Sequence, residues 1–169
     1  MKLLRTTSDH PDFLLLVALL DQDLAERDGP EHAFYAQFNK VDSLRHVVVA
    51  YENGTPAGCG AFKPFDSRSV EIKRMFVQPS LRGKGVARPI LSELEQWAAE
   101  LGYGRCVLET GKRQPEAIAF YSKCGYGAIP NFGQYAGVDN SVCFEKNIGQ
   151  GEGESGPATS GQLDDRPLN

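Results

Sequence analysis

The sequence predicts an α/β protein in which a mixed, mostly antiparallel sheet of six to seven strands is flanked by about four helices. Three β-patterns in residues 45–51, 56–65 and 70–77 follow one another through short links, which is typical of an antiparallel meander. A helix pattern over residues 86–101 then separates strand 70–77 from a strand pattern at 105–110. A strand–helix–strand unit of this length predicts a parallel pair in the middle of the sheet.

The N-terminal elements are predicted from apolar runs and turn residues. Residues 2–5 favour a short first strand. A dense apolar stretch over residues 13–27 predicts a helix that ends near Asp28-Gly29-Pro30, because glycine and proline stop helices. A second short helix is expected at residues 31–38.

The remaining elements follow from turn chemistry and helical spacing. Asn53-Gly54 accepts positive φ at both turn positions and therefore predicts a hairpin between the first two strands of the meander. Apolar residues within 86–101 recur at helical spacing and predict one buried stripe. The last expected elements are a helix at residues 115–124 and strands at residues 126–129 and 141–146.

Composition narrows the classes of function. A net charge of −4 argues against nucleic-acid and anionic-membrane partners. The longest apolar run is too short to cross a bilayer and no secretory signal is visible, so we expect a cytoplasmic protein. The cysteines and histidines lack ligand spacing, so no metal site is expected. Residues 149–169 are rich in Gly, Ser, Pro and acidic residues and predict a disordered tail after one domain of residues 1–148.

A glycine-rich turn is the first segment that can carry chemistry. It reads Arg82-Gly83-Lys84-Gly85-Val86-Ala87 and lies between a predicted strand and a predicted helix. Glycines let backbone N–H groups face a ligand, and a helix N-terminus adds unpaired donors and a positive dipole. The pattern favours a phosphate or pyrophosphate site. The alternative is a basic surface turn that only caps the helix.

Strand 70–77 carries charged residues in the expected middle of the sheet. Under strict alternation its two faces read Glu71, Lys73, Met75 and Ile72, Arg74, Phe76. Charged groups in such a place are costly unless they are paired or functional. Glu71 is therefore either a functional carboxylate or the partner of a neighbouring cation.

The third segment is the predicted helix 115–124. Ala117, Phe120, Tyr121 and Cys124 lie on neighbouring helical positions. Taken alone, Tyr121 reads as an ordinary core aromatic residue.

In this order and spacing, the three segments resemble the GNAT superfamily of acetyl-CoA-dependent N-acetyltransferases. Its pattern Gln/Arg-x-x-Gly-x-Gly/Ala is matched by Arg82, Gly85 and Ala87. Its downstream pattern is Asn-x-x-Ala, then an aromatic pair ending in Tyr, then Gly-Phe/Tyr. The matching residues are Ala117, Phe120, Tyr121, Gly125 and Tyr126, while Gln114 stands where the family has Asn. The resemblance runs over residues 2–148.

This resemblance implies the acyl-CoA N-acyltransferase fold, in which strand 72–77 splays from its parallel neighbour 106–110. Acetyl-CoA, the implied co-substrate, would lie in the resulting V. Its pantetheine would pair with the free strand edge, and its pyrophosphate would bind the glycine-rich turn. The implied cofactor-binding residues are Met75, Phe76, Val77, Arg82, Gly83, Lys84, Gly85, Val86, Ala87, Gln114, Ala117 and Tyr121.

The resemblance also implies direct transfer of the acetyl group to a primary amine, without a covalent enzyme intermediate. Glu71 is the expected general base and Tyr121 the expected acid for the leaving thiolate. A backbone N–H near Phe76 or Val77 would polarise the thioester carbonyl.

The acceptor is expected to be a small, amino-acid-like amine. Lys73 or Arg74 could hold its carboxylate or phosphonate, and a late loop that contains Tyr135 could close over it. Acetylation of a protein amine, a non-catalytic acyl-CoA sensor and an unrelated nucleotide-binding protein are the alternatives. A homodimer is a further expectation, because late strands often pair in this family.

Overall fold

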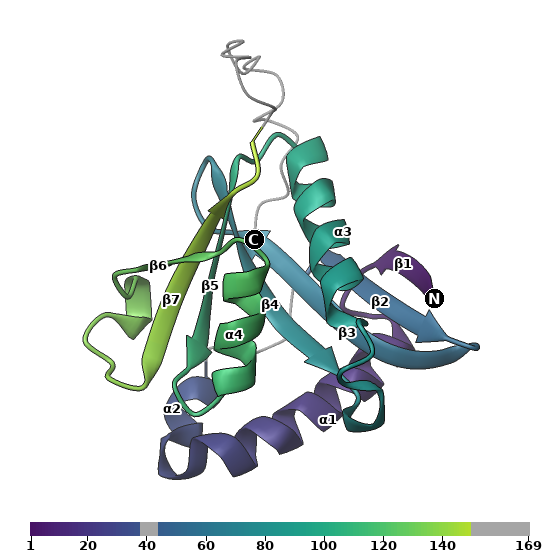
Figure 1. The fold of residues 1–169 in the computed structure, drawn as a ribbon, viewed down its shortest axis with the longest axis horizontal. Helices are drawn as coiled ribbons and strands as arrows, with labels where there is room; N and C mark the ends of the chain where they lie inside the picture. Colours follow the sequence, from purple (N-terminus) through teal and green to yellow (C-terminus); the bar gives the residue numbers. More distant parts are fainter. Residues whose placement is uncertain (38–43, 150–169) are drawn as a thin grey trace.

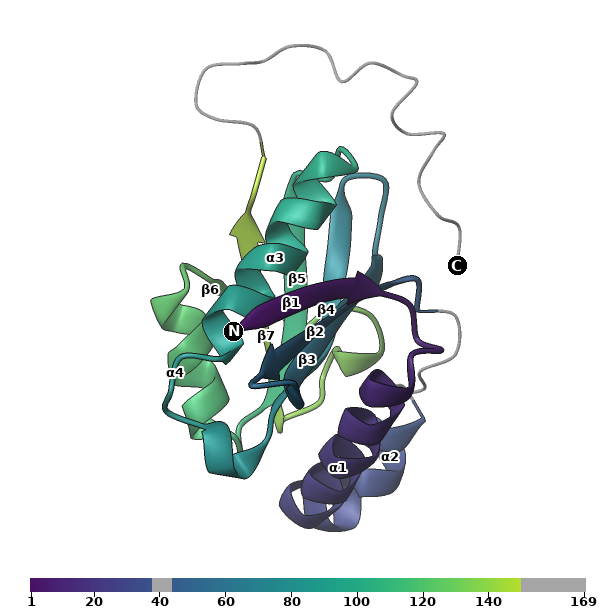
Figure 2. The ribbon, with the colours of Figure 1, turned by 90° about the vertical axis from the view of Figure 1, so that its right-hand side faces the viewer.

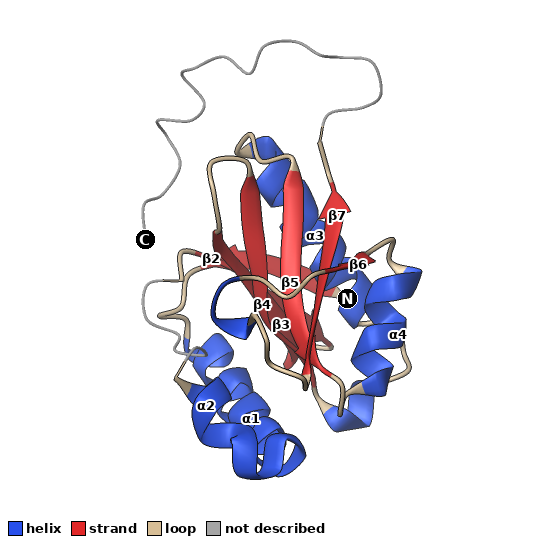
Figure 3. Ribbon diagram, turned by 90° about the vertical axis from the view of Figure 1, so that its left-hand side faces the viewer, coloured by secondary structure: helices blue, strands red, loops and turns tan. Residues whose placement is uncertain are grey.

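A central sheet with helices on both faces organises the computed structural model, which describes residues 1–37 and 44–149 (Figure 1). Helices α1 (Pro11–Asp28) and α2 (His32–Ala36) lie on one face, and α3 (Ala87–Glu100) and α4 (Pro115–Lys123) lie on the other (Figures 2 and 3). Short 3₁₀ turns add η1 (Gly29–Glu31), η2 (Pro79–Leu81) and η3 (Gly133–Tyr135).

The sheet has seven strands in the order β1-β2-β3-β4-β5-β7-β6. Their bounds are β1 Lys2–Thr6, β2 His46–Glu52, β3 Thr55–Pro64, β4 Ser69–Val77, β5 Arg105–Gly111, β6 Gly127–Ile129 and β7 Ser141–Asn147. Every neighbouring pair is antiparallel except β4 and β5, which are parallel. The predicted fold class, the meander and the parallel crossover through α3 are therefore confirmed.

Two of the predictions from sequence concern residues that the structure does not describe. These are Phe38, at the end of the expected second helix, and residues 150–169 of the expected tail. Within the described residues, no helix is both long enough and apolar enough to span a membrane.

The two faces of the sheet bury separate apolar clusters. One cluster packs β2, β3 and β4 against α3 and includes Val48, Phe62, Ile90 and Leu94. The other packs the opposite face of the same strands against α1 and includes Phe13 and Leu16. Because β2 and β3 are covered on both sides, their middle residues are a continuous run of β-branched and small residues, whereas β4 also buries the charged Glu71, Lys73 and Arg74.

The parallel pair at the centre of the sheet is short. Pairing between β4 and β5 begins at Ser69 and Arg105 and ends at Glu71 and Val107. Beyond that point the strands diverge towards their C-terminal ends, with α4 in front of them and α1 below (Figure 1). The rest of β4, residues 72–77, is paired on one side only, with β3.

A β-bulge in β4 overturns the predicted alternation of its faces. Arg74 adopts a φ of 59°, and the register with β3 shifts between Cys59 and Ala61. The extra residue moves every later side chain to the opposite face. Met75 therefore packs in the α3 cluster and Phe76 in the α1 cluster, so Met75 does not share a face with Glu71 and Lys73.

Gly58 of β3 lies close to the backbone of the C-terminal half of β4. A Cβ at this position would lie 2.7 Å from the backbone oxygen of Phe76 and 3.1 Å from Ile90 Cδ1. We expect Gly58→Ala to lower the free energy of unfolding by about 1–3 kcal/mol, because strand backbone cannot yield as a side-chain tip can. Urea denaturation measures the loss. The matched control is Gly127→Ala, since no atom lies within 4 Å of its added methyl, and equal stability of both variants would contradict this packing.

Candidate active site

A cavity of about 420 Å³ opens between the C-terminal half of β4, the glycine-rich turn and α4. This cofactor-side cavity has the size of small-molecule sites in other proteins. Its lining includes Met75, Phe76 and Val77 from β4, and Ala117, Phe120 and Tyr121 from α4. Of the residues of the turn, Arg82, Gly83, Gly85, Val86 and Ala87 line it, whereas Lys84 lines neither this cavity nor its neighbour.

The glycine-rich turn leaves its backbone N–H groups without hydrogen-bond partners among the described residues. Gly83 and Gly85 have φ angles of 76° and 77°, which L side chains rarely adopt, and nothing lies within 4 Å of a Cβ built on either. Among the described residues, no hydrogen bond is donated by the amides of residues 83–87 to another part of the chain. Val86 gives α3 no side-chain cap. Unpaired amides at a helix N-terminus form an anion site.

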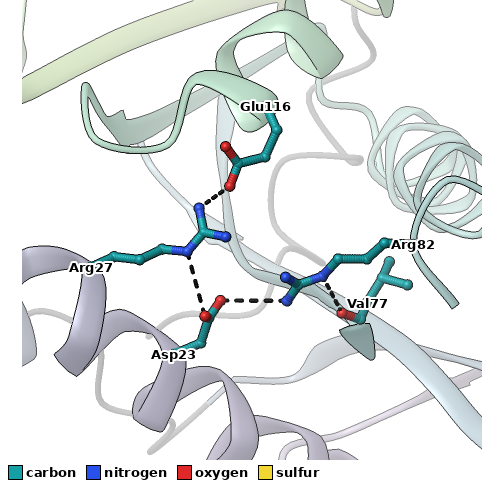
Figure 4. Close-up of polar contacts among 5 residues, drawn as sticks. All are labelled: Asp23, Arg27, Val77, Arg82 and Glu116. Atoms are coloured by element: carbon teal, nitrogen blue, oxygen red, sulfur yellow. Dashed lines mark hydrogen bonds and ion pairs between the residues drawn. The ribbon is translucent and has the colours of Figure 1, made fainter. Parts of the chain in front are cut away.

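Four charged side chains that line this cavity form one network of polar contacts (Figure 4). Arg27 of α1 pairs with Glu116 at the start of α4. Its Nε also lies 3.4 Å from Oδ1 of Asp23 on the same helix. Asp23 also lies 3.4 Å from Arg82 Nη2, and Arg82 Nε donates to the carbonyl of Val77 at 2.9 Å. This network links α1 to both walls of the cavity, and it occupies the last carbonyl of β4.

A second cavity of about 120 Å³ lies on the α1 side of the splayed strands. This acceptor-side cavity is lined by β4, β5, α1 and the aromatic residues Tyr35 and Tyr135. The residues that line both cavities are Leu20, Met75, Gln114, Ala117 and Tyr121. Two chambers therefore meet where the parallel strands have parted.

Buried charged side chains line the acceptor-side cavity. Glu71 Oε2 lies 3.8 Å from Lys73 Nζ, and both side chains are buried. Burial lowers the pKa of Lys73, while Glu71 acts in the opposite direction. Glu71 is thus an ion-pair partner, as the alternative interpretation expected, and its role as a functional carboxylate stays a prediction.

Glu109 on β5 is a carboxylate that sequence reasoning missed. It lies two residues past the last parallel pair and lines the acceptor-side cavity. Ser141 Oγ donates to Glu109 Oε2 at 2.7 Å, and Tyr35 OH lies 3.0 Å from the same Ser141 oxygen. Burial raises the pKa of Glu109 to about 7, against the effect of Ser141. A polar residue within an apolar strand pattern, Val-Leu-Glu-Thr, was the available signal.

Tyr121 lies at the junction of the two cavities. Its side chain is buried, and its ring contacts Phe120, Tyr126 and Phe144. Burial raises its pKa well above the ordinary value, so the phenol stays protonated and can donate a proton. Tyr121 is therefore both a core aromatic residue, as the alternative held, and a cavity residue.

The structure thus brings most of the predicted site residues to two joined cavities. Glu71, Lys73, Arg74 and Tyr135 line the acceptor side, and Gln114 lines both. Within residues 1–37 and 44–149, no three His, Cys, Asp or Glu side chains gather as metal ligands could.

Several known proteins resemble this chain in sequence. The model of the acetyltransferase (GNAT) family matches residues 13–126. The Bacillus subtilis N-acetyltransferase YsnE, whose role is uncharacterized, is 37% identical over 122 residues, which cover 71% of this chain and 72% of that protein. An Azospirillum brasilense protein named IAA acetyltransferase is 39% identical over 102 residues, covering 60% of this chain and 67% of that protein.

Solved structures show the same fold. A Klebsiella pneumoniae protein described among the acyl-CoA N-acyltransferases has a TM-score of 0.73 and 25% identity, covering 87% of this chain and 97% of its own. An aminoglycoside 6'-N-acetyltransferase solved with coenzyme A has a TM-score of 0.65 and 18% identity, covering 88% of this chain and 97% of its own.

Glu109→Gln tests the raised pKa without any substrate. The folded protein holds this carboxyl protonated up to pH about 7, whereas its usual pKa is 4.5. Folding of the wild type therefore loses stability as pH rises from about 4.5 to about 7, and the loss levels off above that. The side chain of the variant cannot ionise, so its free energy of unfolding should exceed that of wild type by roughly 1–2 kcal/mol at pH 8 and equal it at pH 4. This difference is smaller than the pKa shift alone would give, because the side chain is partly exposed to solvent.

Melting temperatures of both proteins across this pH range provide the measurement. The electrostatic surroundings of Glu109 are unchanged by the substitution and include Asp28, Tyr35, Glu71, Lys73, Tyr121, Tyr135 and Cys143. Glu145→Gln is the control, because Glu145 lies on β7 and pairs with Arg105 away from both cavities. A constant difference between wild type and Glu109→Gln at all pH values would refute the assignment.

Proposed function

The chain belongs to the GNAT acetyltransferase family and is an N-acetyltransferase, and from this premise we propose that it moves an acetyl group from acetyl-CoA directly to a small primary amine. The observation that carries the proposal is the junction of two cavities at the splayed strands. One chamber suits a long phosphorylated donor, and the other suits a small charged acceptor.

The cofactor-side cavity fits coenzyme A, which an aminoglycoside acetyltransferase of the same fold binds. The unpaired amides of residues 83–87 would hold the pyrophosphate, with Arg82 beside them. The edge of β4 around Phe76 and Val77, which has no strand partner on the β5 side, would hold the pantetheine. Bound acetyl-CoA supplies a thioester that an amine can attack, forming an amide C–N bond and breaking the C–S bond.

The residues of this chain would then move protons and orient groups. An acceptor that arrives as ammonium must lose one proton before it attacks, and Glu71 is our proposed base. A backbone N–H of β4 near Phe76 or Val77 would polarise the carbonyl. Tyr121, which lines both chambers and stays protonated, would give a proton to the leaving sulfur.

The acceptor-side cavity favours a small amine over a protein chain. Its volume of about 120 Å³ is less than a third of the 420 Å³ of the cofactor-side cavity. Lys73 and Arg74 supply positive charge for a carboxylate or phosphonate, and Tyr135 closes one side. This composition supports an amino-acid-like acceptor. A cytoplasmic location and a homodimer stay predictions.

An amine screen tests the proposed function. Purified protein is incubated with acetyl-CoA and a panel of small primary amines, and release of the free thiol is followed. We expect turnover with at least one small amine and with no protein lysine peptide, because the acceptor-side cavity is small. Binding of acetyl-CoA with no thiol release from any amine would favour the non-catalytic sensor. Thermal protection by ATP but not by acetyl-CoA would remove the cofactor assignment.

Glu71→Gln tests the proposed base. A positioned general base contributes on the order of 10²–10⁴ in rate, so we expect kcat/KM to fall by about that factor at neutral pH. The defect should shrink at high pH, where the free amine needs no base. Glu145→Gln again serves as the control. Near-normal turnover of Glu71→Gln across pH would assign the proton to another group.

A further inference from the structure

Arg74 carries unmet hydrogen-bonding capacity beside the acceptor-side cavity. Its side chain is only 1% exposed and lines this cavity. Nη2 bonds Asp21 of α1 at 2.7 Å, but Nε and Nη1 are buried without a hydrogen-bond partner among the described residues. Buried donors of a charged group are rarely left unpaired, because their desolvation is then uncompensated. Such a pattern indicates a place for an anionic ligand.

The position of Arg74 is built into the sheet. It is the residue at the bulge of β4, and its carbonyl accepts from Cys59 Sγ at 3.4 Å. Apart from Arg74, only Asn53, in the β2–β3 hairpin, has a positive φ among the described residues other than glycine. The unusual backbone therefore aims a cation at the cavity where a regular strand would not.

Other elements contribute acidic residues to the same cavity. Glu109 on β5 is held by Ser141 of β7, and Asp28 of α1 is buried nearby. Burial raises the pKa of Asp28, and Asp28 adds to the raised pKa of Glu109, so ionisation of these carboxyls is costly. A positively charged ligand group between them would relieve that cost.

Resting on the proposed function, we propose that the acceptor is a zwitterion whose anionic group binds Arg74 and whose ammonium lies against Glu109. Arg74 and the carboxyls of Glu109 and Asp28 are opposite in charge and line one small cavity, which joins the cofactor side through Met75 and Tyr121. A short amine with a carboxylate or a similar anion offers a partner to both kinds of charge. An amine without an anion adds no hydrogen-bond partner to the buried guanidinium of Arg74, whose Nη2 already bonds Asp21.

Matched ligand pairs test this inference. Thiol release is measured with the standard α-amino acids, with their carboxamides, and with the amines that lack the carboxylate. We expect wild type to prefer the carboxylate form, by on the order of 10²-fold in kcat/KM, because the neutral analogue leaves a buried charge unpaired. Arg74→Gln should reduce this preference to near one. Arg74→Lys should keep part of it.

The controls separate charge recognition from folding. Arg105→Gln removes a cation of β5 that pairs with Glu145 and lines neither cavity. This variant should therefore prefer the carboxylate form over the carboxamide as strongly as wild type does. Asp21→Asn leaves the guanidinium in place and should retain the preference even if stability falls. Since the preference is a ratio within one protein, a general loss of activity does not imitate it.

Calorimetry supplies a readout that needs no turnover. Amino acids and their carboxamides are titrated into wild type and Arg74→Gln in the presence of coenzyme A. Tighter binding of the carboxylate form, lost in Arg74→Gln, would support the inference even if no amine released thiol and the proposed function had failed. Equal binding and equal turnover of the two forms in wild type would overturn it, while leaving the proposed N-acetyltransferase intact.

Discussion

The arrangement of this site depends on where β4 and β5 stop pairing. Three residue pairs join the parallel strands, and the last of them is Glu71 with Val107. Past it, the edge of β4 has no strand partner on that side, so its backbone groups can serve a ligand. The two cavities meet at the same place, with Tyr121 of α4 facing the junction. Continued pairing would close the passage between donor and acceptor.

The bulge at Arg74 turns one strand into the wall of two different chambers. Before it, Glu71 and Lys73 face the acceptor-side cavity, and after it Met75 joins the opposite apolar cluster. A regular strand would have kept Glu71, Lys73 and Met75 together. The cost is a non-glycine residue at positive φ with two unpaired buried nitrogens. Structural strain and unmet hydrogen bonds thus coincide at the point where the acceptor would bind.

Sequence reasoning found the features that are local in the chain. Asn53-Gly54, the helical stripe of residues 86–101 and the glycine-rich turn each signal their structure within a few residues, and each lies as predicted. The bulge could not be read, because Arg74 is not a residue that favours positive φ and the shift is set by pairing with Cys59 and Ala61. Glu109 was missed for a similar reason. Its partner Ser141 is 32 residues away, and only the folded sheet brings them together.

The network of charged side chains in the cofactor-side cavity must rearrange if a diphosphate is to bind Arg82. Arg82 donates to the carbonyl of Val77, which lies on the strand edge proposed for the pantetheine, and is also drawn towards Asp23. A diphosphate on the adjacent amides would compete for the same guanidinium. If the diphosphate replaced Asp23 as the anionic partner of Arg82, the guanidinium would be paired before and after binding. The cost of removing water from Arg82 would then not oppose binding of the ligand. Arg27 and Glu116 then still connect α1 to α4, so the helix that carries Asp23 remains tied to the wall that carries Tyr121.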